Sequence, residues 1–283
     1  MGFIIHNGEE RPDSIPYLSA QNRAFKFGDG LFESIRIIDG KPVNLEVHLK
    51  RLTSGLKALD IDCPPNFSVD YFRNLLLTLI SKNKISQGGR ARLTVYRESD
   101  GNYLPTNNSC GFVLEAHPYE NNKYTLNEKP LKVDIYDEIR KPYNKISAFK
   151  TSSSLVYIMA AMHAKKENLD DVLLLNERGN IIEASSSNVF IIGNGVLYTP
   201  PIQEGCVGGV MRMVLINAAI ANGIKVYECN LTPQNFLAAD EILLTNAIKG
   251  IQWVGSYRSK RYFNDVAKKL TNLINEVSLN LVK

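Results

Sequence analysis

Lys150 and Glu183 are the two residues whose settings suit amine chemistry. Lys150 lies in "AFKTSSSL", after an aromatic residue and before four small hydroxylated residues. The positive end of a helix disfavours a protonated amine, and a lysine with a lowered pKa is a nucleophile that forms Schiff bases. The alternative is a solvated lysine, the commoner state. A helix packed on a core is expected next, because apolar residues recur with helical spacing at Leu155, Ile158, Met159 and Met162.

Glu183 closes the apolar run "NIIEA" and is followed by a turn of small residues, Ser185–Asn188. A buried carboxylate is costly unless a cation or a hydrogen-bond donor meets it. One interpretation is therefore a carboxylate that faces a protonated ring nitrogen. The other is a glutamate at a strand end that points to solvent.

Two further patterns suit an anion. Gly205, Gly208 and Gly209 precede a helical pattern that starts near Val210, and backbone N–H groups at a helix start bind anions. The stretch lacks the G-K-[ST] of a phosphate-binding P-loop. Arg51 flanks the apolar stripe of a helical segment, where it is either an anion clamp or an exposed helix arginine.

The remaining pattern predicts a mixed fold of the α/β (α+β) class in two domains. A polar, Asn-rich stretch without periodicity at 119–130 is the expected linker, so the domains are 1–118 and 131–283. A hairpin is expected about Asp39-Gly40. The other expected elements are helices over 45–60, 71–83, 208–222 and 261–277 and strands over 2–8, 90–97, 111–118, 132–137, 171–176, 180–184, 188–193, 196–201 and 241–246.

Composition excludes several function classes. The 283 residues are 44% hydrophobic and carry a net charge of +4, without a basic block interleaved with aromatics, so nucleic acid binding is not indicated. The four cysteines form no C-x-x-C pair and the four histidines are scattered, so no metal site is expected. No signal peptide or spanning segment is evident, and we expect a cytoplasmic protein.

The order of these motifs resembles the class IV aminotransferase family, the fold type IV enzymes of pyridoxal 5'-phosphate. The resemblance covers nearly the whole chain and is carried by "FGDGLFESIRI" (27–37), "HLKRL" (48–52), "FKT" (149–151), "LLLNERGNIIEASSSNVFI" (173–191), "GCVGGVMR" (205–212) and "DEILLTNAIKGIQ" (240–252). It implies a small N-terminal α/β domain and a larger C-terminal domain that carries the Schiff-base lysine. It also implies a homodimer.

The resemblance assigns a role to each motif. Lys150 matches the lysine that forms the Schiff base with the cofactor and, once substrate displaces it, acts as general acid and base. Glu183 matches the carboxylate that keeps the pyridine nitrogen protonated, with the pyridinium as its compensating charge. Arg51 matches the phosphate-binding arginine. The backbone amides of Val210 and Met211 and the turn Thr245-Asn246-Ala247 match the rest of the phosphate site.

The family includes branched-chain aminotransferases, D-amino acid aminotransferases and 4-amino-4-deoxychorismate lyases. Three details favour the lyase, which makes 4-aminobenzoate and pyruvate in the folate route: Met211 in place of a threonine, the Asn246-Ala247 turn, and Leu155 in place of a tyrosine. The alternative is a branched-chain or D-amino acid aminotransferase.

Phe32 and Arg97 are the candidate substrate residues, and Arg97 is otherwise an exposed loop arginine. A binding protein that has lost the chemistry is a further alternative, which the presence of the lysine, the glutamate and Arg51 together disfavours.

Overall fold

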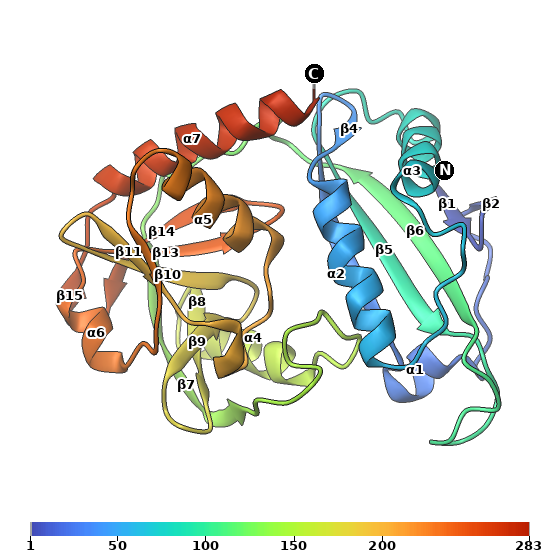
Figure 1. Ribbon diagram of the computed structural model, residues 1–283, viewed down its shortest axis with the longest axis horizontal. Helices are drawn as coiled ribbons and strands as arrows, with labels where there is room; N and C mark the ends of the chain where they lie inside the picture. Colours follow the sequence, from blue (N-terminus) through green and yellow to red (C-terminus); the bar gives the residue numbers. More distant parts are fainter. Residues whose placement is uncertain (1, 283) are drawn as a thin grey trace. The chain divides into compact units, whose positions relative to one another are not determined.

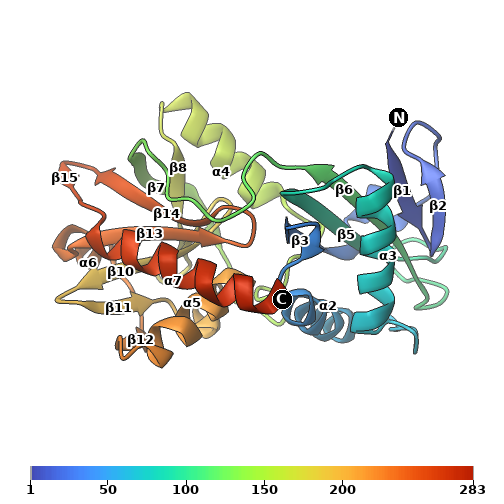
Figure 2. The ribbon, with the colours of Figure 1, turned by 90° about the horizontal axis from the view of Figure 1, so that it is seen from above.

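The computed structural model describes residues 2–282, which form two compact units (Figures 1 and 2). The first unit comprises the chain up to Lys123, the segment Phe149–Ser153 and the end from Ser278. The second comprises Tyr124–Ala148 and Ser154–Val277. The first unit thus ends inside the stretch predicted as a linker. Lys150, however, belongs to the first unit and not to the C-terminal domain that was expected to carry it.

The first unit is a six-stranded sheet with three helices. Its strand order is β2-β1-β6-β5-β3-β4, and neighbouring strands are antiparallel. The strands are β1 (Phe3–His6), β2 (Glu9–Pro12), β3 (Gly30–Ile38), β4 (Lys41–Pro42), β5 (Gly89–Arg97) and β6 (Cys110–Pro118). The helices are α1 (Arg23–Phe27), α2 (Leu45–Ala58) and α3 (Val69–Lys82).

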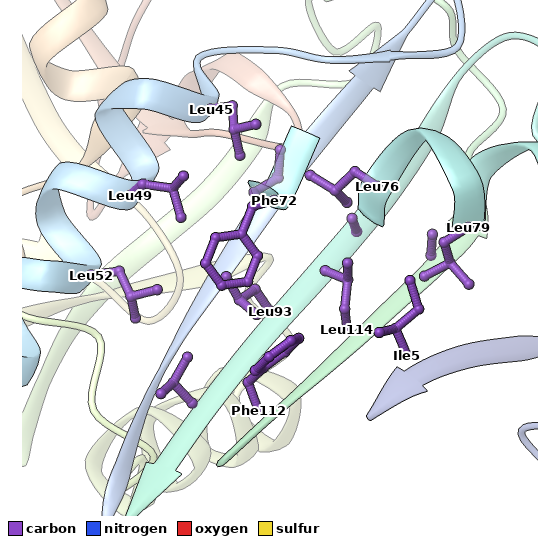
Figure 3. Close-up of a cluster of buried hydrophobic side chains, with 14 of the residues drawn as sticks. Ile5, Leu45, Leu49, Leu52, Phe72, Leu76, Leu79, Leu93, Phe112 and Leu114 are labelled. Carbon is purple, nitrogen blue, oxygen red and sulfur yellow. The ribbon is translucent and has the colours of Figure 1, made fainter. Parts of the chain in front are cut away.

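Helices α2 and α3 form where the leucine spacing predicts them. Leu45, Leu49 and Leu52 of α2 are buried in one cluster with Phe72 of α3 and with apolar residues of the sheet (Figure 3). The Ser68 hydroxyl accepts a hydrogen bond from the backbone of Tyr71 and thereby caps α3. The expected hairpin is also confirmed, because Asp39 and Gly40 both have positive φ and join the paired strands β3 and β4.

The second unit is a nine-stranded sheet in which six strands close on themselves. The path runs β10-β13-β14-β7-β8-β9, and β9 pairs again with β10. The strands are β7 (Leu131–Lys141), β8 (Asp171–Asn176), β9 (Ile181–Ala184), β10 (Asn188–Gly193), β11 (Val196–Thr199), β12 (Val226–Glu228), β13 (Glu241–Asn246), β14 (Gly250–Tyr257) and β15 (Lys260–Arg261). Strands β7, β8 and β14 run parallel, as crossover connections require.

The helices of the second unit are α4 (Leu155–Lys166), α5 (Val210–Ala221), α6 (Pro233–Ala238) and α7 (Asp265–Val282), with a 3₁₀ turn at Ile202–Glu204. Helix α4 differs from the prediction. Leu155, Ile158, Met159 and Met162 are exposed, and Ala160 and Ala164 face the sheet instead. The two alanines pack on Val172 and Leu174. Periodicity correctly identified a helix with an apolar face, but the expectation that this face is packed on the core was wrong.

Within residues 2–282, no helix is long and apolar enough to span a bilayer. The same range contains no group of three or more metal-ligating side chains placed to hold an ion.

Candidate active site

Lys150 is held by backbone pairing with strand β3. The Phe32 N–H donates to the Lys150 carbonyl at 2.9 Å, and the Ser152 N–H donates to the Gly30 carbonyl at 2.9 Å. Lys150 therefore lies next to an isolated β-bridge between Leu31 and Thr151. It is not at the start of a helix, since α4 begins only at Leu155. The helix-dipole argument for Lys150 does not apply, because that effect fades beyond the first turn.

Phe32 carries two cations on its ring. The Lys150 ammonium lies 4.4 Å and the Arg92 guanidinium carbon 3.8 Å from the ring centroid. Arg92 comes from strand β5, where it also donates to the Thr94 hydroxyl at 3.1 Å. The structure thus places an amine and a guanidinium on one aromatic residue. Arg92 was missed by the sequence analysis.

Arg51 is half-buried and its guanidinium forms a fork with Glu33. The Nε and Nη2 atoms donate to the two carboxylate oxygens at 2.8 and 2.5 Å. Glu33 also accepts from His48 Nδ1 at 2.6 Å. Burial alone would raise the pKa of Glu33, but the Arg51 charge and the His48 hydrogen bond hold that pKa at about 2. The exposed-arginine interpretation of Arg51 is therefore excluded.

Arg97 is buried, and its guanidinium donates hydrogen bonds to side chains and backbone carbonyls of the first unit. It donates to Asp29 at 3.0 Å, to the Asn108 side chain at 2.5 Å and to the carbonyls of Leu59 and Asp60 at 2.7 and 2.9 Å. Asp29 also accepts from Arg23, at 2.7 Å. A guanidinium with this set of partners holds loops together, so the structure corrects the expectation that Arg97 binds a substrate carboxylate.

Glu183 is buried in the second unit and its carboxylate has three partners. Oε1 accepts from Lys141 Nζ at 2.6 Å and from the Tyr157 hydroxyl at 2.9 Å, and Oε2 accepts from the Val207 N–H at 2.8 Å. A carboxylate has about four acceptor positions, so one remains for a further donor. The solvent-facing interpretation of Glu183 is wrong.

Lys141 and Tyr157 are functional candidates that sequence reasoning missed. Lys141 compensates the charge of Glu183, a role that had been assigned to the pyridinium alone. Burial, and then the Glu183 charge, raise the pKa of Tyr157, so its hydroxyl stays protonated and donates. A signal was available for Tyr157, which is the one hydroxyl-bearing aromatic residue of its helix. Nothing local marks Lys141.

Helix α5 starts at Val210, as predicted, and no side chain caps its start. The N–H groups of a first helical turn have no intrahelical partner and attract anions. The preceding segment is fixed, because the Asn188 side chain donates to the Val207 carbonyl at 2.7 Å. A Cβ on Gly209 would lie 1.8 Å from the Asn188 side-chain oxygen, so only glycine permits this approach. Val210 and Met211 are buried there.

The turn after β13 faces the same asparagine. Asn188 pairs in register with Thr245 and with Glu183. The Thr245 hydroxyl is buried and has no hydrogen-bond partner within the described residues. The Asn246 side chain accepts from the N–H groups of Ile248 and Lys249, which holds the turn around Ala247 in shape. Glu183, the start of α5 and this turn therefore gather around Asn188.

These groups fit pyridoxal phosphate. The orphaned Thr245 hydroxyl and the uncapped start of α5 suit a phosphate, and the free acceptor position of Glu183 suits a pyridinium N–H.

Comparisons with known proteins agree with this fit. A sequence model of the family described as Amino-transferase class IV matches residues 30–257. A D-alanine aminotransferase of Listeria monocytogenes is 30% identical over 253 residues, which cover 87% of this chain and 84% of the relative. The chain belongs to the class IV aminotransferase family. It is accordingly a pyridoxal-phosphate-dependent enzyme.

Solved structures show the same fold. A branched-chain aminotransferase from Thermoproteus uzoniensis superposes with a TM-score of 0.90 at 22% identity, covering 99% of this chain and 95% of the other. A Legionella pneumophila protein, provisionally named a 4-amino-4-deoxychorismate lyase, has a TM-score of 0.83 at 26% identity. That match covers 93% of this chain and 96% of the other.

Proposed function

We propose that this chain acts on the primary amine of a substrate that carries a carboxylate. The observation that supports this is the Phe32 ring, on which the Lys150 ammonium and the Arg92 guanidinium both lie. Arg92 binds the carboxylate by charge-assisted hydrogen bonds, and Lys150 meets the amine end. In this assignment Arg92 takes the substrate role that the sequence suggested for Arg97.

The cofactor contacts follow from the chemistry of each side chain. We assign the cofactor aldehyde to Lys150, the phosphate to Arg51 with the amides of Val210 and Met211 and the Asn246-Ala247 turn, and the pyridine nitrogen to Glu183. When bound, the cofactor ring supplies an electron sink. Glu183, whose Oε1 accepts from Lys141 and Tyr157, would accept a hydrogen bond from the ring N–H of the bound cofactor. The Lys150 amine would act as the general acid and base that moves protons to and from the substrate.

The lyase reaction on 4-amino-4-deoxychorismate is the reaction we favour. It splits the substrate into 4-aminobenzoate and pyruvate: the enolpyruvyl side chain takes up a proton, the ether carbon–oxygen bond breaks so that this side chain leaves as pyruvate, and the ring loses a proton and becomes aromatic. Support comes from Asn246, an amide where a hydroxyl residue would favour the transaminase; its oxygen accepts from the Ile248 and Lys249 N–H groups and its nitrogen donates to the Ser187 hydroxyl. The 26% identity to the Legionella pneumophila protein is consistent with it.

An aminotransferase is the second candidate. The Listeria monocytogenes relative bears the name D-alanine aminotransferase, and the Thermoproteus uzoniensis structure that of a branched-chain aminotransferase. An amino acid also combines an amine with a carboxylate, so the pair Lys150 and Arg92 suits both reactions. The two differ in the second substrate, because only a transaminase needs a 2-oxo acid.

Two measurements test this proposal. Protein with bound cofactor should be yellow, lose its colour on borohydride treatment, and show the reduced adduct on Lys150 in a peptide map. A colourless protein that binds no cofactor would instead indicate a binding protein without this chemistry. The reaction is then decided by offering 4-amino-4-deoxychorismate without an amino acceptor. Release of pyruvate supports the lyase, whereas turnover confined to pairs of amino acid and 2-oxo acid establishes the transaminase.

We also propose that the chain forms a homodimer through helix α4. Leu155, Ile158, Met159 and Met162 are 71%, 52%, 42% and 62% exposed, and together they form a charge-free apolar stripe at helical spacing. Such a stripe is self-complementary about a two-fold axis, the commonest symmetry of soluble oligomers. A charged partner would find no counter-charge on it. The favoured occupant is therefore a second copy of the chain.

A further inference from the structure

Glu33 and His48 form a buried pair behind Arg51. Both residues are 1% exposed, although an acid and a histidine would ordinarily seek solvent. Glu33 comes from strand β3 and directly follows Phe32, and His48 and Arg51 lie one turn apart on helix α2. Neither Glu33 nor His48 has a part in the chemistry assigned above. Their burial therefore calls for another role.

We propose that Glu33 and His48 are positioning residues, which hold the Arg51 guanidinium in the orientation that binds the cofactor phosphate. The inference rests on the proposed assignment of the phosphate to Arg51. The Glu33 carboxylate accepts from two nitrogens of one edge of the guanidinium, at 2.8 and 2.5 Å. A fork of this kind fixes both the distance and the plane of the guanidinium.

His48 fixes the carboxylate in turn. The pKa of Glu33 is about 2, so this carboxylate is ionised near neutral pH and only accepts hydrogen bonds. The proton in the 2.6 Å contact therefore belongs to His48 Nδ1. Burial lowers the pKa of His48, and Arg51 and Lys150 lower it further against the opposing effect of Glu33. A neutral imidazole thus anchors Glu33 without adding a third positive charge beside Arg51 and Lys150.

Glu33 also has an opposing effect on anion binding. Its negative charge lowers the positive potential around Arg51, so a variant that deletes the charge would mix a loss of positioning with a gain in attraction. The informative variant keeps the negative charge but moves the carboxylate away from the Arg51 guanidinium. Glu33→Asp does this, because an aspartate is one methylene shorter and cannot make the same fork without pulling Arg51 back.

The experiment compares two ligands on cofactor-free protein. Pyridoxal 5'-phosphate and pyridoxal differ only in the phosphate, so the ratio of their dissociation constants reports on phosphate binding alone. In Glu33→Asp we expect Kd for pyridoxal 5'-phosphate to rise roughly tenfold or more, and Kd for pyridoxal to change by less than about twofold. The matched control is Glu46→Asp, the same change at an exposed position of α2, and it should alter neither constant.

A second arm tests whether Glu33 acts through Arg51. In an Arg51→Lys background the fork is already lost, so adding Glu33→Asp should change Kd for pyridoxal 5'-phosphate by less than about twofold. If Glu33→Asp does not fold, His48→Leu, which leaves both charges in place, is measured with the same two ligands and the same expected ratio. Equal losses for both ligands, no loss at all, or additivity with Arg51→Lys would each overturn the inference. A wild-type protein that binds neither ligand would instead refute the proposed function.

Discussion

Lys141 and Glu183 form a buried ion pair, with Lys141 Nζ 2.6 Å from Glu183 Oε1 and side-chain exposures of only 10% and 3%. Lys141 also donates to the Ser147 carbonyl at 3.2 Å, which fixes its ammonium on the connection that leads to Lys150. Desolvation offsets much of the attraction in such a pair, so its net contribution to stability is small, but removing one partner leaves an uncompensated buried charge. Glu183 therefore has a compensating cation before any cofactor binds.

Lys141→Met should destabilise the cofactor-free protein by roughly 3–5 kcal/mol, because Glu183 loses its counter-charge in a buried site. Adding Glu183→Gln should recover most of the lost stability, since a neutral amide does not need the ammonium as a counter-charge. Urea unfolding of the single and double variants measures both effects. Lys145→Met, at an exposed lysine of the same connection, is the control and should leave stability unchanged. Additive losses in the double variant would contradict a coupled pair.

Stability should fall in mild acid because of His48. Its folded pKa lies below the unfolded value of 6.5, so the unfolded chain takes up the proton first. The contribution of His48 is fully present above pH 6.5 and is lost as the pH falls from there toward the folded pKa, with a slope of at most about 1.4 kcal/mol per pH unit.

His48→Leu should flatten the dependence of unfolding free energy on pH between about pH 5 and 7. Glu33 does not interfere in this range. Because its folded pKa is depressed, its contribution to the unfolding free energy is lost only as the pH falls from about 4.5 toward 2. Urea unfolding at several pH values gives the slope. The exposed His117, changed to Gln, serves as the control. An unchanged slope in His48→Leu would show that His48 is not neutral in the folded protein.

The same substitution should affect catalysis at Arg92 and stability at Arg97. Arg92→Gln should raise KM roughly tenfold or more for a carboxylate-bearing substrate, the loss expected for a charge-assisted hydrogen bond, with little change in Tm. Arg97→Gln should instead destabilise the fold by roughly 3 kcal/mol, because Asp29 and the carbonyls of Leu59 and Asp60 lose their donors. Steady-state kinetics and thermal melting separate the two. A raised KM confined to Arg97→Gln would restore the assignment made from sequence.

These two arginines show what a sequence can and cannot indicate about this site. They lie on the same strand, five positions apart in "RLTVYR", and side chains alternate between the faces of a strand. Arg97 shares its face with Leu93 and Val95 of the helix-covered core, whereas Arg92 shares the other face with Thr94. Only the register with β3, which sets Phe32 opposite Thr94, reveals which arginine meets the aromatic ring.

The elements themselves were largely predictable, because their signals are local. Leucine spacing predicted α2, and the Asp39-Gly40 pair predicted the hairpin. The environment of a helix face is a tertiary property, so the same period predicted a buried face for α4 where the structure exposes it. The partner of Glu183 was also out of reach, since Lys141 is 42 positions away in the chain. The exposed face of α4 and the pairing of Lys141 with Glu183 both depend on the closed sheet that brings β7, β8 and β9 together.

The exposed stripe of α4 should hold two copies of the chain together. Ile158→Glu combined with Met162→Glu places two charges on residues that are 52% and 62% exposed, which costs little in the monomer but would bury unpaired charge in a dimer. Sedimentation should therefore show a dimer for the wild type and a monomer for this variant. Ile220→Glu is the matched control, because Ile220 is 59% exposed on α5 and lies outside the stripe, and it should remain dimeric. A dimer that survives both charges would place the interface elsewhere, and a monomeric wild type would refute the proposed homodimer.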